Sequence, residues 1–481
     1  MIDIATESKL PFYQQIYEQL KQQIVTGVLK EGTRLASTRE LAKNLCVARN
    51  TVENAYAQLC LEGYVLNKAG SGFIVLDICG DKLPTRCLPT TGTTIRHSQP
   101  PARPGNTLAG ADTAAICRYD FQYGNLGQTS FPSALWRRLT ADALSSFEAQ
   151  KISFYSDKQG ELELRTAIMT YLLESRGVRC IPEQIVLCCG TQYALDVICH
   201  LASGYGLQIA VEDPGYDGAK IVFQNNGYEI VPVSVGAEGI KLDELQRSPA
   251  RLVYITPSHQ FPTGAVMPIH NRLQLLQWAE AKDGIIIEDD YDSEFRYHTR
   301  PIPALQSIDV DDRVVYLGTF SKSLSPGLRI SYIILPMRLL TRYHTVYAGY
   351  YSTIPWLQQK IVSLYMVRGH WERHLRKVCL QNKKRHDTIM KAIVECLGNR
   401  VKIHGCNAGL HLLLEFTMGE TEKWLIEKAK DCGVRVYPTE QFWHRKESCP
   451  NNTILMGFSM LSEQDIMAGI GLLKKAWSGE N

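Results

Sequence analysis

A lysine flanked by hydroxyl side chains is the feature of the sequence best suited to covalent chemistry. Lys322 lies in the run TFSKSLSPGLR, which follows an apolar segment at residues 314–317. Thr319 and Ser321 flank the lysine, and Arg329 follows seven residues after it. A lysine amine can form an imine with an aldehyde, while hydroxyls and an arginine can hold a phosphate. The motif predicts a site for a cofactor that carries both groups, although a basic surface loop would explain it equally well if it stood alone.

A second group of reactive side chains follows the apolar run at residues 284–287. Asp289 and Tyr291 come at the end of this predicted strand, where α/β folds place their ligands. A carboxylate there can keep a pyridine nitrogen protonated, and a tyrosine can bond the phenolic oxygen of the same ring. We expect the other acidic residues of the cluster, Asp290 and Asp292, to be solvated or to cap turns.

A third segment could bind a phosphate. Gly190, Thr191 and Gln192 follow the apolar run IVLCC and open a helical pattern. Backbone amides at a helix N-terminus, together with a threonine hydroxyl, suit an anion. This segment alone is weak evidence, but the three segments in this order predict one cofactor pocket.

The elements that must position these residues form a long tract of short apolar runs separated by helical patterns. Examples of the runs are IAVEDP, LVYITP and VVYLGTFSK. Such runs indicate a mainly parallel sheet covered on both faces, so we expect an α/β domain over residues 118–481. Residues 78–117 are crowded with Pro, Thr, Gly and Ser and predict a linker, which leaves residues 1–77 as a small separate domain.

The composition is that of a globular protein without a membrane span. The 481 residues carry a net charge of +3, which by itself indicates no nucleic-acid partner. The fourteen cysteines show no paired CxxC sets, which argues against a zinc site or a disulfide framework. The first residues are too polar for a signal peptide, and the longest apolar runs are only as long as strands. We therefore expect a cytoplasmic protein.

The small domain has the order of elements of a winged helix-turn-helix. Ile16, Leu20 and Ile24 recur at helical spacing in a first helix that should end near Gly27. Ser37 is expected to cap a short helix that runs to residue 45, and a second helix should span residues 49–62. Two short strands, at residues 65–66 and 73–75, complete the pattern.

This domain resembles the GntR family in the strings GVLKEGTRLASTRELA, VARNTV, EGY and GSGF. The resemblance implies binding to double-stranded operator DNA, with Arg49 opening the recognition helix. The alternative is a small helical domain that binds protein, because net charge gives no support for DNA. The DNA-contacting residues that we expect are Arg34, Ser37, Arg39, Arg49, Thr51 and Gly72.

The large domain resembles fold-type I aminotransferases and, in VEDPGY, TPSHQFPTG, EDDYDSEF and FSKSLSPGLR, the MocR/GabR regulators. The resemblance implies a pyridoxal 5'-phosphate site with Lys322 as the imine-forming lysine. It also implies that Tyr155 reaches the phosphate in a neighbouring subunit, and hence a homodimer, with domain swapping as one arrangement. The cofactor-binding residues expected from this resemblance are Lys322, Asp289, Tyr291, Gly190, Thr191, Gln192, Tyr216, Thr319, Ser321, Arg329 and Tyr155.

The sequence departs from the aminotransferase pattern at Phe261, at Ser331, where a glycine is usual, and at the position of the carboxylate-binding arginine. Phe261 stands where these enzymes carry an asparagine on the phenolic oxygen, so His259 or Gln260 could take over that contact. The arginine that holds a substrate carboxylate is replaced by Leu455, and Arg435 is a possible substitute, though more simply structural. Gly218 stands where GABA-responsive members have an arginine, which argues against GABA as the ligand.

Three functions are compatible with these features. A regulator could sense a small amino compound that displaces the cofactor from Lys322, or it could sense pyridoxal phosphate itself. Alternatively, the chain could be an aminotransferase with an appended DNA-binding domain. The winged helix and the missing carboxylate arginine favour a regulator, and the enzyme question stays open.

Overall fold

A computed structural model describes residues 10–45, 47–68, 72–76, 117–127, 130–297 and 302–478. The expected linker at residues 78–117 lies outside the described residues except for Cys117. Among the described helices, none combines the length and the apolar character needed to cross a membrane.

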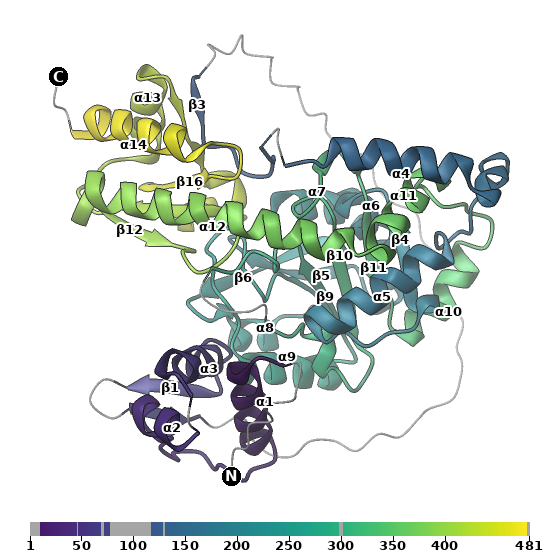
Figure 1. Ribbon diagram of the computed structural model, residues 1–481, viewed down its shortest axis with the longest axis horizontal. Coiled ribbons are helices and arrows are strands. Elements are labelled where there is room, and N and C mark those ends of the chain that lie inside the picture. Colours follow the sequence, from purple (N-terminus) through teal and green to yellow (C-terminus); the bar gives the residue numbers. More distant parts are fainter. Residues whose placement is uncertain are drawn as a thin grey trace.

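The N-terminal domain has the expected order of elements (Figure 1). Ile16, Leu20 and Ile24 are buried on one face of the first helix, as predicted. Ser37 accepts a hydrogen bond from the amide of Glu40 and so caps the second helix. The elements are α1 (Phe12–Val25), α2 (Thr38–Asn44), α3 (Arg49–Leu61), β1 (Val65–Lys68) and β2 (Gly72–Val75).

The N-terminal domain is docked on the large domain where α9 (Ile269–Ala281) begins. The amide of Ile269 donates to the carbonyl oxygen of Glu62 at 2.8 Å, and Ile269 joins the hydrophobic core of the small domain. In Figure 1 this domain, drawn in purple, lies directly beside α9. The segment that precedes α9 comes from the carboxyl end of β8, so one stretch of chain connects the docking point with that edge of the sheet.

The large domain is built on a mainly parallel eight-stranded sheet, as predicted. Its strand order is β4-β11-β10-β9-β8-β5-β6-β7, and the five strands from β10 to β6 are mutually parallel. The strands are β4 (Ile185–Cys188), β5 (Gln208–Asp213), β6 (Glu229–Gly236), β7 (Gly239–Ile240), β8 (Leu252–Ile255), β9 (Ile285–Asp290), β10 (Val314–Thr319) and β11 (Ser331–Ile334).

Helices cover both faces of this sheet, because alternate strand residues are apolar on each side. The first face packs against α6 (Thr191–Ala202), α7 (Asp217–Asn225) and α10 (Met337–Val346). The second face packs against α4 (Ser133–Ser145), α5 (Leu162–Arg176), α9 and α11 (Trp356–Val367), with α8 (Leu242–Arg247) near the end of the sheet that carries β6.

A smaller C-terminal subdomain follows the long helix α12 (His370–Leu397), as Figure 1 shows in green and yellow. Its sheet has the order β12-β13-β16-β15, and a separate pair, β14-β3, ties the start of the large domain to it. The elements are β3 (Tyr119–Asp120), β12 (Val401–His404), β13 (His411–Phe416), α13 (Glu422–Asp431), β14 (Val434–Arg435), β15 (Tyr437–Pro438), β16 (Thr453–Gly457) and α14 (Glu463–Ser478).

We predict that Gly63→Ala weakens the docking of the small domain. Gly63 has φ +78°, and a Cβ there would lie 2.7 Å from the Cβ of Pro268. Gly27→Ala is the matched control, because Gly27 has φ +74° but would meet nothing within 4 Å. Both variants carry about 1–2 kcal/mol of backbone strain, but only Gly63→Ala should speed hydrogen exchange at the Ile269 amide. Equal exchange in the two variants would contradict the docking contact.

Candidate cofactor-binding site

A cavity of about 510 Å³ opens at the carboxyl edge of the parallel strands. The register pairs Leu317 of β10 with Asp289 of β9, so the segments after both strands meet at this edge. The cavity is lined by Gln122, Tyr123, Gly124, Thr191, Gln192, Tyr216, Asp217, Tyr254, Thr256, Phe261, Asp289, Tyr291, Thr319, Ser321, Lys322, Pro326, Arg329, Tyr437, Gln441, Phe442 and Leu455. All three predicted segments therefore contribute to one pocket.

The amine of Lys322 lies inside this pocket. Its Nζ donates to the carbonyl oxygen of Gly124 at 3.4 Å and lies 4.5 Å from the ring centre of Tyr123. Burial lowers the pKa of Lys322 to about 8 against the opposing effect of nearby carboxylates. A larger fraction of this amine is therefore unprotonated near neutral pH than of an exposed lysine, as a nucleophilic lysine requires.

Asp289 presents one free oxygen to the pocket. Its Oδ2 accepts a 2.6 Å hydrogen bond from Tyr254, whereas its buried Oδ1 has no partner among the described residues. Burial is the main cause that raises the pKa of Asp289 to about 7. A protonated ring nitrogen would satisfy Oδ1 and stabilise the charged carboxylate.

Arg329 lies against the glycine that precedes α6. Gly190 has φ +84°, and a Cβ at this position would collide with the Arg329 guanidinium. Thr191 and Gln192 begin α6, and Thr319 donates to the Oγ of Ser321 at 2.9 Å across the pocket wall. A helix N-terminus, hydroxyls and an arginine thus converge, which is a set suited to a phosphate.

The expected solvation of Asp290 and Asp292 is wrong, because both side chains are buried. Asp290 accepts from Arg176 at 2.7 Å and from Tyr316 at 2.5 Å, on the side of β9 opposite Asp289. Asp292 accepts from Nδ1 of His259 at 2.9 Å.

Phe261 has no polar side-chain atom that could contact the phenolic oxygen of the cofactor. Of the two neighbouring candidates, His259 and Gln260, only His259 contacts Tyr291. The Tyr291 hydroxyl lies 3.2 Å from Nδ1 of His259 and donates to the His259 carbonyl oxygen at 2.9 Å. The Gln260 amide points away and donates to the carbonyl oxygens of Pro214 and Phe261. The Gln260 amide is therefore already engaged by backbone carbonyls.

The end of the pocket that would face a ligand is mostly apolar. Phe261, Phe442 and Leu455 form a small hydrophobic cluster there. Among the described lining residues, the only cations are Lys322 and Arg329. Arg435 is exposed and lies near Asp120, with an N–O distance of 3.9 Å, so it is structural and outside the lining.

The presence of a glycine at position 218 has a steric explanation in this chain. A Cβ at this position would collide with the ring of Tyr216, whose side chain lines the pocket. A larger residue at 218 would therefore require Tyr216 to move. The aromatic ring occupies the space that an arginine side chain would need.

Tyr155 is the one expected cofactor residue that lies away from the pocket of its own chain. It is 79% exposed and stacks on Tyr351 with a ring separation of 4.1 Å. Phe147 and Phe154 nearby are 89% and 74% exposed. Among the described residues, these aromatic side chains are therefore largely uncovered.

The expected DNA-contacting residues lie at two helix starts and at the wing. Ser37 and Arg39 lie at the start of α2, and Arg49 and Thr51 open α3. The guanidinium of Arg34 lies beside Gly72, where a Cβ would be 3.4 Å from Nε. Arg49 forms an ion pair with Glu53 at 2.6 Å, and both side chains are more than one-third exposed.

Several pocket residues are absent from the sequence-based prediction. Tyr254 lies in the apolar run LVYI, and its place near the end of a strand beside β9 was a usable signal. Tyr123 and Gly124 had no such signal, because the pairing of β3 with β14 brings their segment to the pocket from far away in sequence.

The residues present fit pyridoxal phosphate. Asp289 lines the cavity and has a buried oxygen without a partner among the described residues, which suits a protonated pyridine nitrogen. Gly190 leaves room for the Arg329 guanidinium beside the start of α6. Lys322 supplies the amine for the aldehyde. These three features belong to one cavity, so the fit rests on their mutual placement.

Comparison with known proteins shows two matching families. Residues 12–75 match "Bacterial regulatory proteins, gntR family", and residues 122–448 match "Aminotransferase class I and II". The HTH-type transcriptional regulator YdeL of Bacillus subtilis is 38% identical over 97% of both chains. The "Probable rhizopine catabolism regulatory protein MocR" of Rhizobium meliloti is 32% identical over 99% of this chain and 96% of its own.

The large domain also matches solved enzymes. Kynurenine aminotransferase of Pyrococcus horikoshii superposes with a TM-score of 0.68 at 26% identity, over 76% of this chain and 92% of that one. Enzymes of this fold are dependent on pyridoxal phosphate, which is therefore the cofactor of this domain. The chain belongs to the MocR-type transcription regulators, in which a GntR-family DNA-binding domain is joined to an aminotransferase class I and II domain.

Proposed function

We propose that this regulator senses an amino compound, or pyridoxal phosphate itself, through covalent chemistry at Lys322. The observation that carries the proposal is a buried amine of lowered pKa in a 510 Å³ cavity, within a chain whose other domain binds DNA. When bound, pyridoxal phosphate supplies an aldehyde that bonds covalently to a primary amine. Binding of an effector amine would free Lys322 and change its contacts with Gly124 and Tyr123.

The remaining pocket residues would orient the cofactor. We assign Asp289 to the ring nitrogen and Tyr291 to the phenolic oxygen, and Tyr216 to the space beside the ring. Arg329 would hold the phosphate with Thr319, Ser321 and the amides at Gly190, Thr191 and Gln192. Each assignment is supported by a place in or beside the same cavity.

The change in the contacts of Lys322 must also reach the DNA-binding domain. The segment between β8 and α9 lines the pocket at Thr256 and Phe261 and ends at Pro268 and Ile269, where the small domain docks. We propose this segment as the route of coupling. A useful response requires the two states to differ in effector affinity, typically by ~1–3 kcal/mol.

We also propose that the active unit is a homodimer in which Tyr155 reaches the phosphate bound by the partner. The exposure of Tyr155, Phe147 and Phe154 supports this arrangement, because a protein seldom leaves such an aromatic surface uncovered. Within each chain we assign residues 1–77 to the DNA-binding domain, 78–117 to the linker and 118–481 to the cofactor domain. A regulator that binds DNA must share a compartment with that DNA, so we expect a cytoplasmic location.

An aminotransferase with an added DNA-binding domain is the alternative. The lysine would then also move a proton between substrate carbons. The lack of a further cation among the described lining residues argues against a substrate carboxylate at this site, since these enzymes act on amino acids. Continuous release of a keto acid from candidate amino acids would support the enzyme over the regulator.

The first prediction separates DNA binding from ligand response. Lys322→Ala should keep its affinity for DNA from upstream of its own gene but lose any change in that affinity when amines and cofactor are added. Arg49→Ala should do the reverse, with a normal cofactor absorption band and weakened DNA binding. Fluorescence anisotropy measures DNA affinity, and absorbance measures the cofactor band. A ligand response that survives in Lys322→Ala would contradict the proposal.

The second prediction concerns the phosphate. Arg329→Gln should weaken the binding of pyridoxal phosphate by about 1.5–3 kcal/mol, or roughly ten- to a hundredfold, because a charge-assisted hydrogen bond is lost. Pyridoxal, which lacks the phosphate, is the matched control and should bind both proteins alike. An equal loss for the two ligands would place Arg329 elsewhere than at the phosphate.

The third prediction is a pH dependence. Only the unprotonated amine of Lys322 can attack the aldehyde, and its pKa is about 8. The rate of cofactor attachment to the cofactor-free protein should therefore rise with pH up to about 8 and then level off. Stopped-flow absorbance measures this rate. A rate that keeps rising toward the ordinary lysine pKa of about 10.4 would show that the amine is not perturbed.

A further inference from the structure

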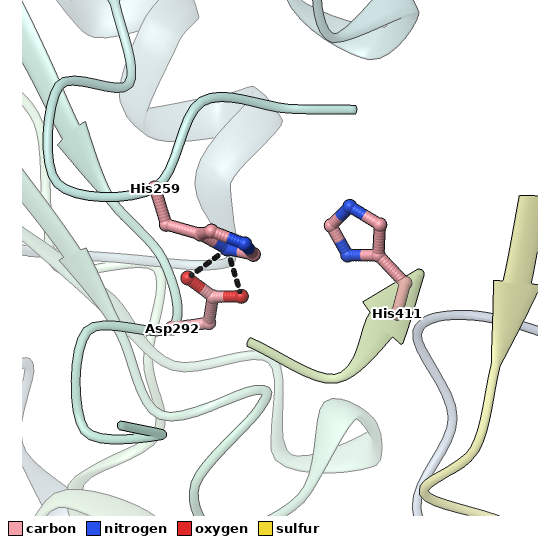
Figure 2. Close-up of side chains that lie close together, drawn as sticks. All are labelled: His259, Asp292 and His411. Carbon is pink, nitrogen blue, oxygen red and sulfur yellow. Dashed lines mark hydrogen bonds and ion pairs between the residues drawn. The ribbon is translucent and has the colours of Figure 1, made fainter. Parts of the chain in front are cut away.

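Three buried side chains beside the cofactor pocket form a cluster that the proposed function does not use (Figure 2). His259 follows β8, Asp292 follows β9, and His411 opens β13 of the C-terminal subdomain. They are at most 2% exposed, and the atoms that could act as ligands all lie within 4.8 Å of one another. Figure 2 shows the His411 ring facing the His259–Asp292 pair across a gap.

The hydrogen bonds of the two histidines fix where their lone pairs lie. Nε2 of His411 donates to the carbonyl oxygen of Pro262 at 3.1 Å, so Nδ1 carries the lone pair. Nδ1 of His259 donates to the Asp292 carboxylate, so its Nε2 carries the lone pair. Neither lone-pair nitrogen has a hydrogen-bond partner among the described residues, although both are fully buried. Two buried acceptors without a partner among the described residues point to a partner such as an ion or an ordered water.

Two glycines leave room for the His259 ring and the Asp292 carboxylate. A Cβ at Gly409 would collide with the His259 ring and would lie 2.7 Å from Oδ2 of Asp292. A Cβ at Gly264 would lie 3.3 Å from Nε2 of His259. Both glycines have positive φ, +76° and +72°, so the backbone itself disfavours a larger residue.

We propose that His259 and His411 bind a divalent transition-metal ion of the Zn²⁺ class, with Asp292 holding the ring of His259 in place. Imidazole nitrogens are ligands that such ions take, and water would fill the remaining positions. The carboxylate on Nδ1 of His259 and the carbonyl on Nε2 of His411 are the outer contacts that orient metal-binding histidines. The charge of the ion also compensates the buried carboxylate of Asp292.

The site would join two parts of the large domain. His259 and Asp292 belong to the edge of the central sheet, whereas His411 belongs to the C-terminal sheet. Ligand atoms around tetrahedral zinc lie roughly 3.3 Å apart, so the ion draws these two parts together. Tyr291, which lines the cofactor pocket, contacts His259 directly, so the ion is placed to influence that pocket.

Metal content of the full-length holoprotein tests the proposal. After treatment with a chelator, the protein is loaded with Zn²⁺, desalted and measured by mass spectrometry of the metal. We expect one ion per chain in the wild type, and its loss in His259→Ala and His411→Ala. His404→Ala is the matched control, because His404 lies on the neighbouring strand, is 43% exposed and pairs with Glu415. It should keep the ion.

Circular dichroism and the cofactor absorption band verify that each variant is folded. If a variant fails to fold, zinc X-ray absorption of the wild type decides, because two imidazole ligands give a distinct scattering pattern. A wild type that retains no zinc, or variants that retain as much as the wild type, would overturn the proposal and leave an ordered water as the partner of the two nitrogens. The measurement is independent of effector response, so its failure leaves the proposed sensing function standing.

Discussion

The parallel pairing of β9 with β10 is the constraint on which the site depends. Because Asp289 and Leu317 are register partners, the segment after β10 must carry Lys322 to the same edge of the sheet as the carboxylate. Alternation along β9 then sends Asp289 to the pocket and Asp290 to the opposite side, where Arg176 neutralises it. Two adjacent aspartates can both be buried only because each has a different environment.

Buried arginines hold the segment that connects this edge with the DNA-binding domain. Arg176 donates to the Oγ of Ser258 at 2.6 Å, and Arg272 donates to the carbonyl oxygen of Pro257 at 3.1 Å. Arg272 also donates to the carbonyl oxygen of Met267, at the far end of the segment. These contacts hold both ends of the segment that we propose as the route of coupling between the ligand site and the DNA-binding domain.

Much of the fold and of the pocket can be predicted from the sequence, because ligand-binding residues in this type of fold follow the carboxyl ends of the strands. Lys322, Asp289 and Thr191 were identifiable since each closely follows an apolar run, and the N-terminal helices were identifiable from Ile16 and Ser37. The burial of Asp290 and Asp292 could not be predicted, because it depends on partners at least 26 residues away in the sequence. The contribution of Tyr123 depends likewise on a strand pairing that joins distant segments, which no local pattern encodes.

Attachment of the cofactor to Lys322 can be tested directly on the protein. Reduction of the holoprotein with borohydride makes that attachment permanent, and tandem mass spectrometry of the digest then locates the modified residue. We expect the phosphopyridoxyl group on the peptide that contains Lys322 and on that residue alone. Modification of a different lysine, such as Lys220, or a protein that carries no modification after loading and reduction, would contradict it.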